Sequence, residues 1–454
     1  MSENGVTVII IPPPTANGPL HIGHLSGPFL ASDIAARAAK ARGERVLAMA
    51  GVDVGQNYIP KMAKAKGVDV EELIDRNRSE ILEAFHRGHI HYDAFVDPQE
   101  GEYRRVIAEM LTDMVRRGGV TMSEETLYGC ADCGSTLHHS YVEGLCSWCG
   151  EPSSGGSCER CGGYTSTDTL VDPVCACCGG AARPFVASVP MLRLEDFRPQ
   201  LEEIWRSAEL PRPVRDLIAR YSSTELPAIP LAYPTDWGIE GTGPLAGMRV
   251  DAYVEVGLSW LYGVARALDE TADTLDACVQ AWSEVDALWQ FHGIDNTFWF
   301  IAFWPALYAA AGLERAPLRG LVVNEFYTLD GEKFSTSRNH AVWAHEFLAS
   351  EDPRLVRLYL AWDRPDRAQT DFTRESFEAF RDFAEPLLSD AGDSEVSVAQ
   401  LPPSLVPAER QRGERALELV GFDVALAARS LLSLLAAGTR ERGPLLTALT
   451  GAEA

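Results

Sequence analysis

Two histidines near the start of the chain have a spacing and a setting that would suit phosphate chemistry. His21 and His24 belong to the segment Pro14-Thr-Ala-Asn17-Gly-Pro-Leu-His21-Ile-Gly23-His24, which follows an apolar run. Imidazole N–H groups can donate to phosphate oxygens on which negative charge develops during a reaction. Gly23 would let a nucleotide approach the backbone closely. A lone His-x-x-His is more typical of a surface turn, so the interpretation depends on what surrounds the pair.

A polar loop far downstream carries positive charge and hydroxyl groups. It reads Asp330-Gly-Glu-Lys333-Phe-Ser335-Thr-Ser337-Arg338. Alone, this loop has the composition of an ordinary exposed turn. The loop indicates a function only when it is considered together with the histidine segment.

Nine of the ten cysteines fall between Cys130 and Cys178. Thiolates in Cys-x2-Cys pairs favour tetrahedral zinc, and such pairs in a chain without a secretion signal indicate metal ligands rather than disulfides. Four pairs predict two zinc sites, and we expect a nested arrangement in which the second pair joins the third and the first joins the fourth. Four thiolates leave no open position, so the sites would be structural; an iron–sulfur cluster is the alternative. The predicted ligands are Cys130, Cys133, Cys146, Cys149, Cys158, Cys161, Cys175 and Cys178.

The two remaining cysteines have no partner at this spacing. Cys177 is expected to be a bystander, and Cys278 a thiol in the core.

The elements around these residues predict a doubly wound, Rossmann-like parallel α/β fold. Residues 6–11 are continuously apolar, as a buried parallel strand is, and three prolines end the run. A helical pattern over 25–42 and a strand over 45–50 complete a strand–loop–helix–strand unit, whose ligands bind at the carboxyl ends of the strands. Further helices are predicted at 56–66, 70–87, 102–118, 197–221, 259–287 and 297–312, and further strands at 251–256, 289–292 and 320–324.

Changes in composition divide the chain into four parts. We expect a first half of the catalytic domain at 1–119, an inserted zinc-knuckle module rich in Gly, Ser and Cys at 120–190, a second half at 191–372, and a short helical tail at 373–454. No apolar run reaches the roughly 20 residues that a membrane helix needs. The first residues lack the basic start of a signal peptide. These features predict a cytoplasmic protein without a membrane partner.

The charge of the chain argues against a large nucleic-acid surface. The 40 Lys and Arg residues and 65 Asp and Glu residues give a net charge of −25. Phosphate binding requires a basic face. After Lys333 there is no lysine, and residues 371–454 carry eight Arg against fourteen Asp and Glu. The acidic tail is therefore poorly suited to tRNA.

Taken together, the two polar segments resemble the signatures of class I aminoacyl-tRNA synthetases, His-Ile-Gly-His and Lys-Met-Ser-Lys-Ser. The surrounding sequence is similar to the methionyl type over roughly residues 5–390. The matching elements are Pro14 to His24, Asp236-Trp-Gly-Ile239, Gly293-Ile-Asp295 and Phe303-Trp-Pro-Ala306. The resemblance implies an ATP-dependent, AMP-forming ligase that joins ATP and an amino acid into an aminoacyl adenylate, with Mg²⁺ and two structural zinc ions.

The same resemblance implies roles for individual residues. It implies that His21, His24 and Lys333 are catalytic, because they would hold the transferring phosphates. It also implies that Asp295 binds the ribose. The implied nucleotide-binding set is Asn17, Gly23, Gly293, Asp295, Ser335, Ser337 and Arg338. The implied amino-acid-binding set is Pro13, Thr15, Asp53, Glu255, Tyr262 and Phe300.

Several positions depart from the family pattern. Asp53 matches the residue that binds the α-amino group, but Val54-Gly55-Gln56 replaces the family's Glu-His-Gly. Thr15 and Phe300 replace a tyrosine and a histidine of the methionine pocket, and Glu255 replaces an aromatic residue there. A thioether is a poor neighbour for an unpaired carboxylate, so Glu255 suits a polar or cationic substrate group. The alternative is that Glu255 points outward or pairs with a local arginine.

The second signature lysine is replaced by Thr336, which puts phosphate handling in question, although Arg338 could compensate. The family reads the anticodon with an Asn and a Trp of a longer helical bundle, whereas residues 363–454 contain no tryptophan.

These departures predict a methionyl-type catalytic core without an anticodon reader. It resembles synthetase-like ligases of natural-product pathways, which esterify an amino acid onto a small nucleophile such as an N-hydroxylated amine, without tRNA. Because no His-rich cupin segment is present, a cupin partner would be a separate protein. The alternatives are a truncated methionine–tRNA ligase and a catalytically inactive regulatory binder; the intact His21, His24, Asp295 and Lys333 argue against the latter.

Overall fold

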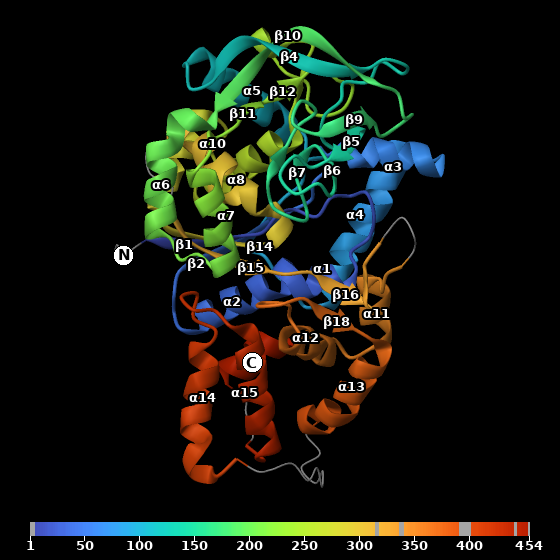
Figure 1. The fold of residues 1–454 in the computed structure, drawn as a ribbon. Helices are drawn as coiled ribbons and strands as arrows, with labels where there is room; N and C mark the ends of the chain where they lie inside the picture. Colours follow the sequence, from blue (N-terminus) through green and yellow to red (C-terminus); the bar gives the residue numbers. More distant parts are fainter. Residues whose placement is uncertain (1–4, 314–316, 336–339, 390–400, 440–442, 453–454) are drawn as a thin grey trace.

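The computed structural model describes residues 5–313, 317–335, 340–389, 401–439 and 443–452 (Figure 1). Its centre is a five-stranded sheet in the order β15-β14-β1-β2-β3. Every neighbouring pair in this sheet is parallel. The strands are β1 (Val6–Ile10), β2 (Val46–Gly51), β3 (Ala94–Val96), β14 (Val285–Gly293) and β15 (Leu318–Asn324). The predicted doubly wound α/β fold is confirmed.

The strand order reverses beside β1, which pairs with β2 on one side and with β14 on the other. This reversal creates the crevice at which open α/β sheets bind ligands. All five residues of β1 are buried, which explains why its sequence is continuously apolar. The strands predicted at 6–11, 45–50, 289–292 and 320–324 all occur, with small shifts at their ends.

The helix predicted at 25–42 is interrupted. The chain forms a short α1 (Ile22–His24), a π-helical turn (Leu25–Phe29) and then α2 (Leu30–Ala41). Pro28 lies inside the π-helical turn. Proline has no N–H to donate, so the regular hydrogen-bond ladder cannot continue through it. Gly43 follows α2 with a φ of 81°, as expected for a residue that ends a helix.

The strand predicted at 251–256 is wrong. These residues begin helix α8 (Ala252–Leu268), and the Asp251 carboxylate caps it by accepting from the backbone N–H groups of Tyr253 at 2.9 Å and Val254 at 3.4 Å. A short apolar run fits a buried helix as well as a strand, and the capping aspartate decides between them. The predicted long helix at 259–287 is divided into α8 and α9 (Leu275–Ala281). The helix predicted at 297–312 consists of a π-helical turn (Trp299–Phe303) and α10 (Trp304–Ala310).

A module made mainly of short strands is inserted in the sequence between β3 and β14 of the central sheet. It lies at the top of the molecule in Figure 1. Its long strands β4 (Thr121–Cys130) and β10 (Ala182–Arg193) pair antiparallel along ten residues each, Cys130 to Thr121 against Ala182 to Met191. Between them lie β5 (Val142–Leu145), β6 (Pro152–Ser154), β7 (Gly156–Ser157), β8 (Tyr164–Thr165) and β9 (Val171–Cys175). The helices on either side of this module in sequence are α3 (Tyr58–Lys66), α4 (Val70–Arg87), α5 (Tyr103–Arg116), α6 (Arg198–Ser207) and α7 (Arg212–Ser222).

The C-terminal part is helical, as predicted, and lies at the opposite end of the molecule from this module (Figure 1). The small strands β16 (Tyr327–Leu329), β17 (Glu332–Lys333) and β18 (Thr370–Phe372) precede it, and the helices α11 (Ala344–Ser350) and α12 (Pro353–Trp362) lie between β17 and β18. The helices after β18 are α13 (Arg374–Leu388), α14 (Val406–Arg415), α15 (Val424–Ala436) and α16 (Pro444–Thr450).

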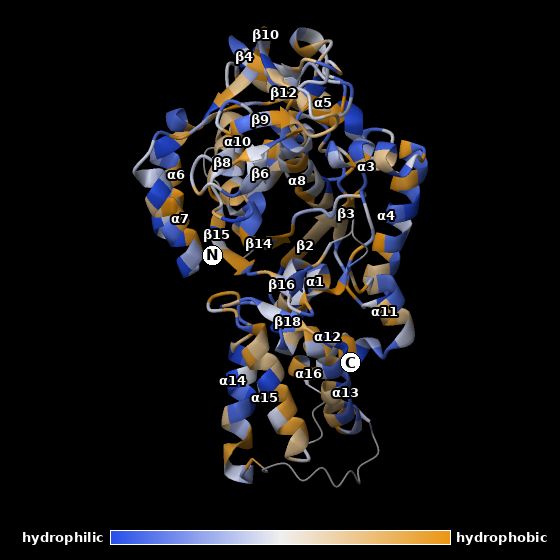
Figure 2. Cartoon of the chain, turned by 45° about the vertical axis from the view of Figure 1, so that its right-hand side comes forward, coloured by the Kyte–Doolittle hydropathy of each residue, from blue (hydrophilic) through white to orange (hydrophobic). Residues whose placement is uncertain are grey.

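Figure 2 shows the hydrophobic strands of the central sheet inside the molecule and helices of mixed polarity around them. Within the described residues, every helix is too short or too polar to cross a bilayer.

Candidate active site

A cavity of about 470 Å³ lies at the carboxyl ends of β1, β14 and β15. Three stretches of chain form most of its wall: residues 12–24 after β1, residues 293–296 after β14, and residues 324–327 after β15. This is the place at which the doubly wound topology predicts a ligand.

His21 and His24 contact each other at the start of α1. The backbone N–H of His24 donates to Nδ1 of His21 at 3.3 Å, and the backbone N–H of His21 donates to Nδ1 of His24 at 3.2 Å. Their rings stack with centroids 3.6 Å apart, and His21 also stacks on Phe334 at 4.3 Å. Both Nδ1 atoms therefore accept, which leaves each Nε2 to carry the proton and donate.

Desolvation by the surrounding protein sets the charge of this pair, although the His24 side chain remains partly open to solvent. It lowers the pKa of His24 to about 4 and the pKa of His21 well below its usual range. Neighbouring positive charge on His24 and Lys333 lowers the pKa of His21 further. Both imidazoles are thus neutral near pH 7, and each offers one fixed Nε2–H to a bound anion.

Gly23 has a packing role that the sequence did not indicate. A Cβ atom at this position would lie 3.0 Å from Nδ1 of His21 and 3.2 Å from Cδ2 of Phe334. A side chain would therefore disturb the stack of His21 on Phe334. The glycine is needed for the geometry of the histidines as well as for access to the backbone.

The predicted nucleotide residues divide into three groups. Asn17, Gly23, Gly293 and Asp295 line the cavity, as do the predicted catalytic residues His21, His24 and Lys333. Ser335 does not line it; its backbone N–H and C=O pair with His340 at 2.9 and 3.0 Å. Ser337, Arg338 and also Thr336 lie outside the described residues.

Lys333 is held by two neighbours. Its ammonium forms an ion pair with the carboxylate of Glu159, and it lies 5.0 Å from the centroid of the Phe326 ring. Asp295 is half-buried near both charges. Removal from bulk water raises the pKa of this carboxyl group, the charge of Glu159 raises it further, and the charge of Lys333 lowers it.

Three of the predicted substrate residues, Pro13, Thr15 and Asp53, line the same cavity. The Thr15 hydroxyl donates to Oδ2 of Asp53 at 3.0 Å, while the backbone N–H groups of Gly55 and Gln56 donate to Oδ1 at 2.9 and 3.3 Å. Burial outweighs these hydrogen bonds and raises the pKa of Asp53 to about 6.

The other three predicted substrate residues do not line the cavity. Phe300 is completely buried and stacks on His292 at 3.9 Å. Tyr262 packs edge-on against Tyr103 at 6.2 Å. Both therefore belong to the packing behind the site.

Glu255 lies behind the loop that contains Asp53. It is 4% exposed, and its Oε1 accepts from the Tyr103 hydroxyl at 3.3 Å. A Cβ atom on Gly55 would lie 2.3 Å from Oε2, so a side chain there would have to displace the Glu255 carboxyl group. Burial, followed by the charge of Asp53, raises the pKa of Glu255 to about 8, and Arg104 lowers it by less. The carboxyl group neither points outward nor forms a described ion pair with arginine; it is mainly neutral and supports the loop.

Some cavity residues were not predicted as ligands. Gln56 and Asn324 each line the cavity, are nine-tenths buried, and have a side-chain oxygen without a partner among the described residues. Asn324 ends β15, and its place at the carboxyl end of a predicted strand was a usable signal. Glu159 comes from the cysteine-rich module, so no pattern near the nucleotide signatures could have indicated it.

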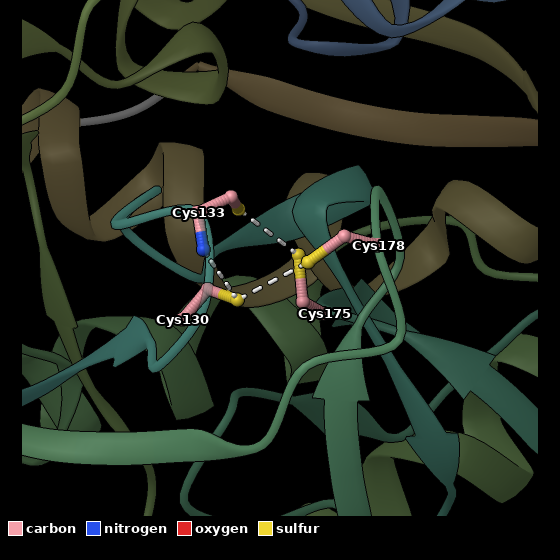
Figure 3. Close-up of side chains that lie close together, drawn as sticks. All are labelled: Cys130, Cys133, Cys175 and Cys178. Carbon is pink, nitrogen blue, oxygen red and sulfur yellow. Dashed lines mark hydrogen bonds between the residues drawn. The ribbon is translucent and has the colours of Figure 1, made fainter.

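Eight cysteines form two clusters with the nested pairing that the sequence predicted. Figure 3 shows the first, Cys130, Cys133, Cys175 and Cys178; the second contains Cys146, Cys149, Cys158 and Cys161. Sulfur pairs within them lie 3.4 to 3.8 Å apart. Tetrahedral zinc with bonds of about 2.3 Å requires sulfurs about 3.8 Å apart, so both clusters fit zinc.

The remaining two cysteines lie outside these clusters. Cys278 is fully buried, as expected of a core thiol, and Cys177 is partly buried beside the first cluster.

Known proteins similar to this chain are methionine–tRNA ligases. The ligase of Methanocaldococcus jannaschii is 28% identical over 364 residues, which cover 80% of this chain and 54% of that protein. The ligase of Thermomicrobium roseum is 29% identical over 376 residues, covering 80% of this chain and 63% of that protein. The chain thus spans 54 to 63% of the length of these two relatives.

A solved structure of Mycobacterium tuberculosis methionyl-tRNA synthetase, in complex with methionyl-adenylate, shares the fold. The TM-score is 0.69 at 16% identity, over 94% of this chain and 82% of that chain. Residues 7–387 match the family model described as tRNA synthetases class I (M), a family of ATP-dependent ligases. The chain therefore belongs to the class I tRNA synthetases of the methionyl type.

Proposed function

We propose that the chain activates an amino acid with ATP, forming an aminoacyl adenylate and pyrophosphate. The observation that carries this proposal is the convergence of His21, His24, Asp295 and Lys333 on one cavity at the strand ends. An amino-acid carboxylate would attack the α-phosphorus, and the bond to pyrophosphate would break. Two neutral Nε2–H donors and one ammonium would meet the charge that develops on the phosphate oxygens. Mg²⁺ would arrive with the triphosphate, and the Asp295 carboxylate would accept from the ribose hydroxyls, as predicted from the resemblance.

The amino acid is proposed to bind by its ammonium group beside Asp53. The unpartnered oxygen of Gln56 adds a second acceptor at this end of the cavity. We propose that the amino acid is not methionine, because this cavity lacks the family's methionine contacts. Thr15 replaces a larger tyrosine in the cavity wall, and Phe300 and Tyr262 do not line the cavity but pack behind it. Glu255 would act on the substrate through Asp53 and not by direct contact.

A second cavity supports a small-molecule acceptor. It has a volume of about 580 Å³ and shares Tyr58, Glu159, Tyr253, Asp295 and Asn296 with the first. The described residues that line it include four carboxylates and neither lysine nor arginine. The phosphates of a tRNA end would be repelled by such a wall, whereas an amine would be attracted. An N-hydroxylated amine in natural-product biosynthesis, with a separate cupin enzyme, remains a prediction from the resemblance.

Two other functions compete with this proposal. A truncated methionine–tRNA ligase is favoured by the names of the relatives. An inactive regulatory binder is disfavoured by the intact His21, His24, Asp295 and Lys333. The two cysteine clusters are proposed to hold structural zinc in all three cases.

Amino-acid-dependent exchange of pyrophosphate into ATP separates these functions. The full chain would be assayed with each amino acid, with and without tRNA. We expect exchange with an amino acid other than methionine and no stimulation by tRNA. Exchange with methionine together with tRNA charging would favour the truncated ligase, and the absence of exchange with every amino acid, tested with amine acceptors, would favour the binder.

A further inference from the structure

Glu159 belongs to the cysteine-rich module but also lines the nucleotide cavity. It follows Cys158 directly, within the third Cys-x2-Cys pair, and it lines both cavities described above. Its carboxylate forms an ion pair with the ammonium of Lys333, 174 positions later in the chain. A segment outside the central sheet thus contacts the lysine that the proposed function assigns to the phosphates.

We infer that Glu159 is a positioning residue that holds Lys333 in the nucleotide-free protein and releases it to the triphosphate. This inference rests on the proposed function, because it takes the phosphates of ATP as the ligand of Lys333. No role for a residue between metal-binding cysteines was expected from the sequence.

The exposure of the pair makes release possible. The side chains of Lys333 and Glu159 are 52% and 65% exposed. An ion pair that is open to water contributes at most about 1 kcal/mol, a factor of about five in a binding constant. A triphosphate carries several charges and can take the lysine from a single carboxylate. Glu159 can therefore hold Lys333 only reversibly.

Neighbouring contacts fix both partners of the pair. The backbone N–H of Cys158 donates to the carbonyl of Gly163 at 2.8 Å, which holds the turn that carries Glu159. The Ser157 hydroxyl donates to the backbone carbonyl of Asp295 at 2.8 Å, so the same segment contacts the other side of the nucleotide site. The Phe326 ring also contacts the ammonium of Lys333 and would keep it beside the cavity after its ion pair with Glu159 breaks.

The test is a double-mutant cycle on ATP binding, measured by equilibrium dialysis with the zinc-loaded full chain. Glu159→Gln removes the charge that competes for Lys333, so ATP should bind up to about five-fold more tightly. Lys333→Ala should weaken ATP binding, and adding Glu159→Gln to it should produce no further gain. Glu159→Asp should keep wild-type affinity, and so should Glu124→Gln, which neutralises an exposed carboxylate of the same module that lines neither cavity.

Each contrary outcome has a distinct meaning. Unchanged or weaker ATP binding by Glu159→Gln would overturn the inference. An equal gain in ATP affinity from Glu159→Gln in the Lys333→Ala background would also overturn the inference. Repulsion between the Glu159 carboxylate and the triphosphate would then explain the gain without Lys333. A wild-type chain that does not bind ATP would contradict the proposed function itself. Zinc content and melting temperature check that the variants fold, and Glu159→Ala repeats the measurement if the glutamine variant loses zinc.

Discussion

At the scale of single residues, the proposed nucleotide site depends on the tautomers of two histidines. The reciprocal backbone contacts of His21 and His24 make both Nδ1 atoms acceptors, and desolvation by the surrounding protein keeps both rings neutral. A neutral donor can stabilise a developing negative charge without itself requiring a counter-charge. In the proposed reaction the pair would present two preorganised N–H groups to the phosphates of ATP.

Replacing His24 by alanine should reduce amino-acid-dependent pyrophosphate exchange by roughly 10²-fold, the loss typical of one transition-state donor. The variant also removes the stacking partner of His21, so the melting temperature must be measured alongside. His86→Ala changes an exposed histidine on α4 and serves as the control. Wild-type exchange by the His24 variant would exclude this residue from the reaction.

The buried carboxyl group of Glu255 should be visible in the pH dependence of stability. Its pKa is about 8 in the folded chain and 4.5 in the reference state, so between these values the folded protein retains a proton that the unfolded chain has lost. The free energy of unfolding should therefore fall as pH rises from about 4.5 to 8, by at most about 1.4 kcal/mol per pH unit from this group. Glu255→Gln mimics the neutral form and should flatten that fall in urea titrations. Parallel curves for the two proteins would mean that Glu255 is charged.

At the scale of elements, four of the five strands of the central sheet and the cysteine pairs could be predicted, and β3 and the path of α8 could not. Buried parallel strands such as β1 have a continuous apolar pattern that few other elements share. The start of α8 is also apolar, and only the capping contacts of Asp251 distinguish it from a strand. The family pattern placed Glu255 among the substrate residues, whereas on α8 its carboxyl group packs behind the loop that contains Asp53 and does not line the cavity.

The metal clusters should stabilise the inserted module. Cys158→Ser removes one of four thiolates, so zinc content should fall from two ions per chain towards one and the melting temperature should drop. Cys177→Ser is a matched control, because this cysteine lies in the same module outside both clusters. Elemental analysis and thermal unfolding measure the two effects. An iron chromophore, or two zinc ions in the serine variant, would contradict the assignment.

At the scale of the whole molecule, one buried arginine connects the tail to the sheet-bearing half. Arg357 on α12 bonds to the Asp33 carboxylate of α2 at 2.7 Å and to the carbonyls of Ala448 and Leu449 in α16 at 2.9 and 3.2 Å. Arg357→Met would leave Asp33 without this partner in the interior and should cost about 3–5 kcal/mol in urea unfolding. Arg354→Gln, which affects a more exposed contact with Asp352, should cost below about 1 kcal/mol. Equal losses of unfolding free energy in the two variants would show that the burial of the ion pair does not determine the destabilisation.

The charge of the molecule leads to the last prediction, which concerns tRNA. The net charge is −25, the wall of the second cavity contains four carboxylates, and residues 371–454 hold more acids than arginines. Binding driven by phosphates requires many cations and weakens steeply with salt. We therefore expect no charging of initiator or elongator tRNA by the full chain, and adenylate formation that changes little between about 50 and 200 mM salt. Aminoacylation of tRNA and salt titration of the exchange reaction measure these outcomes; efficient methionylation would instead identify the chain as a shortened tRNA ligase, with a basic surface formed elsewhere on the molecule.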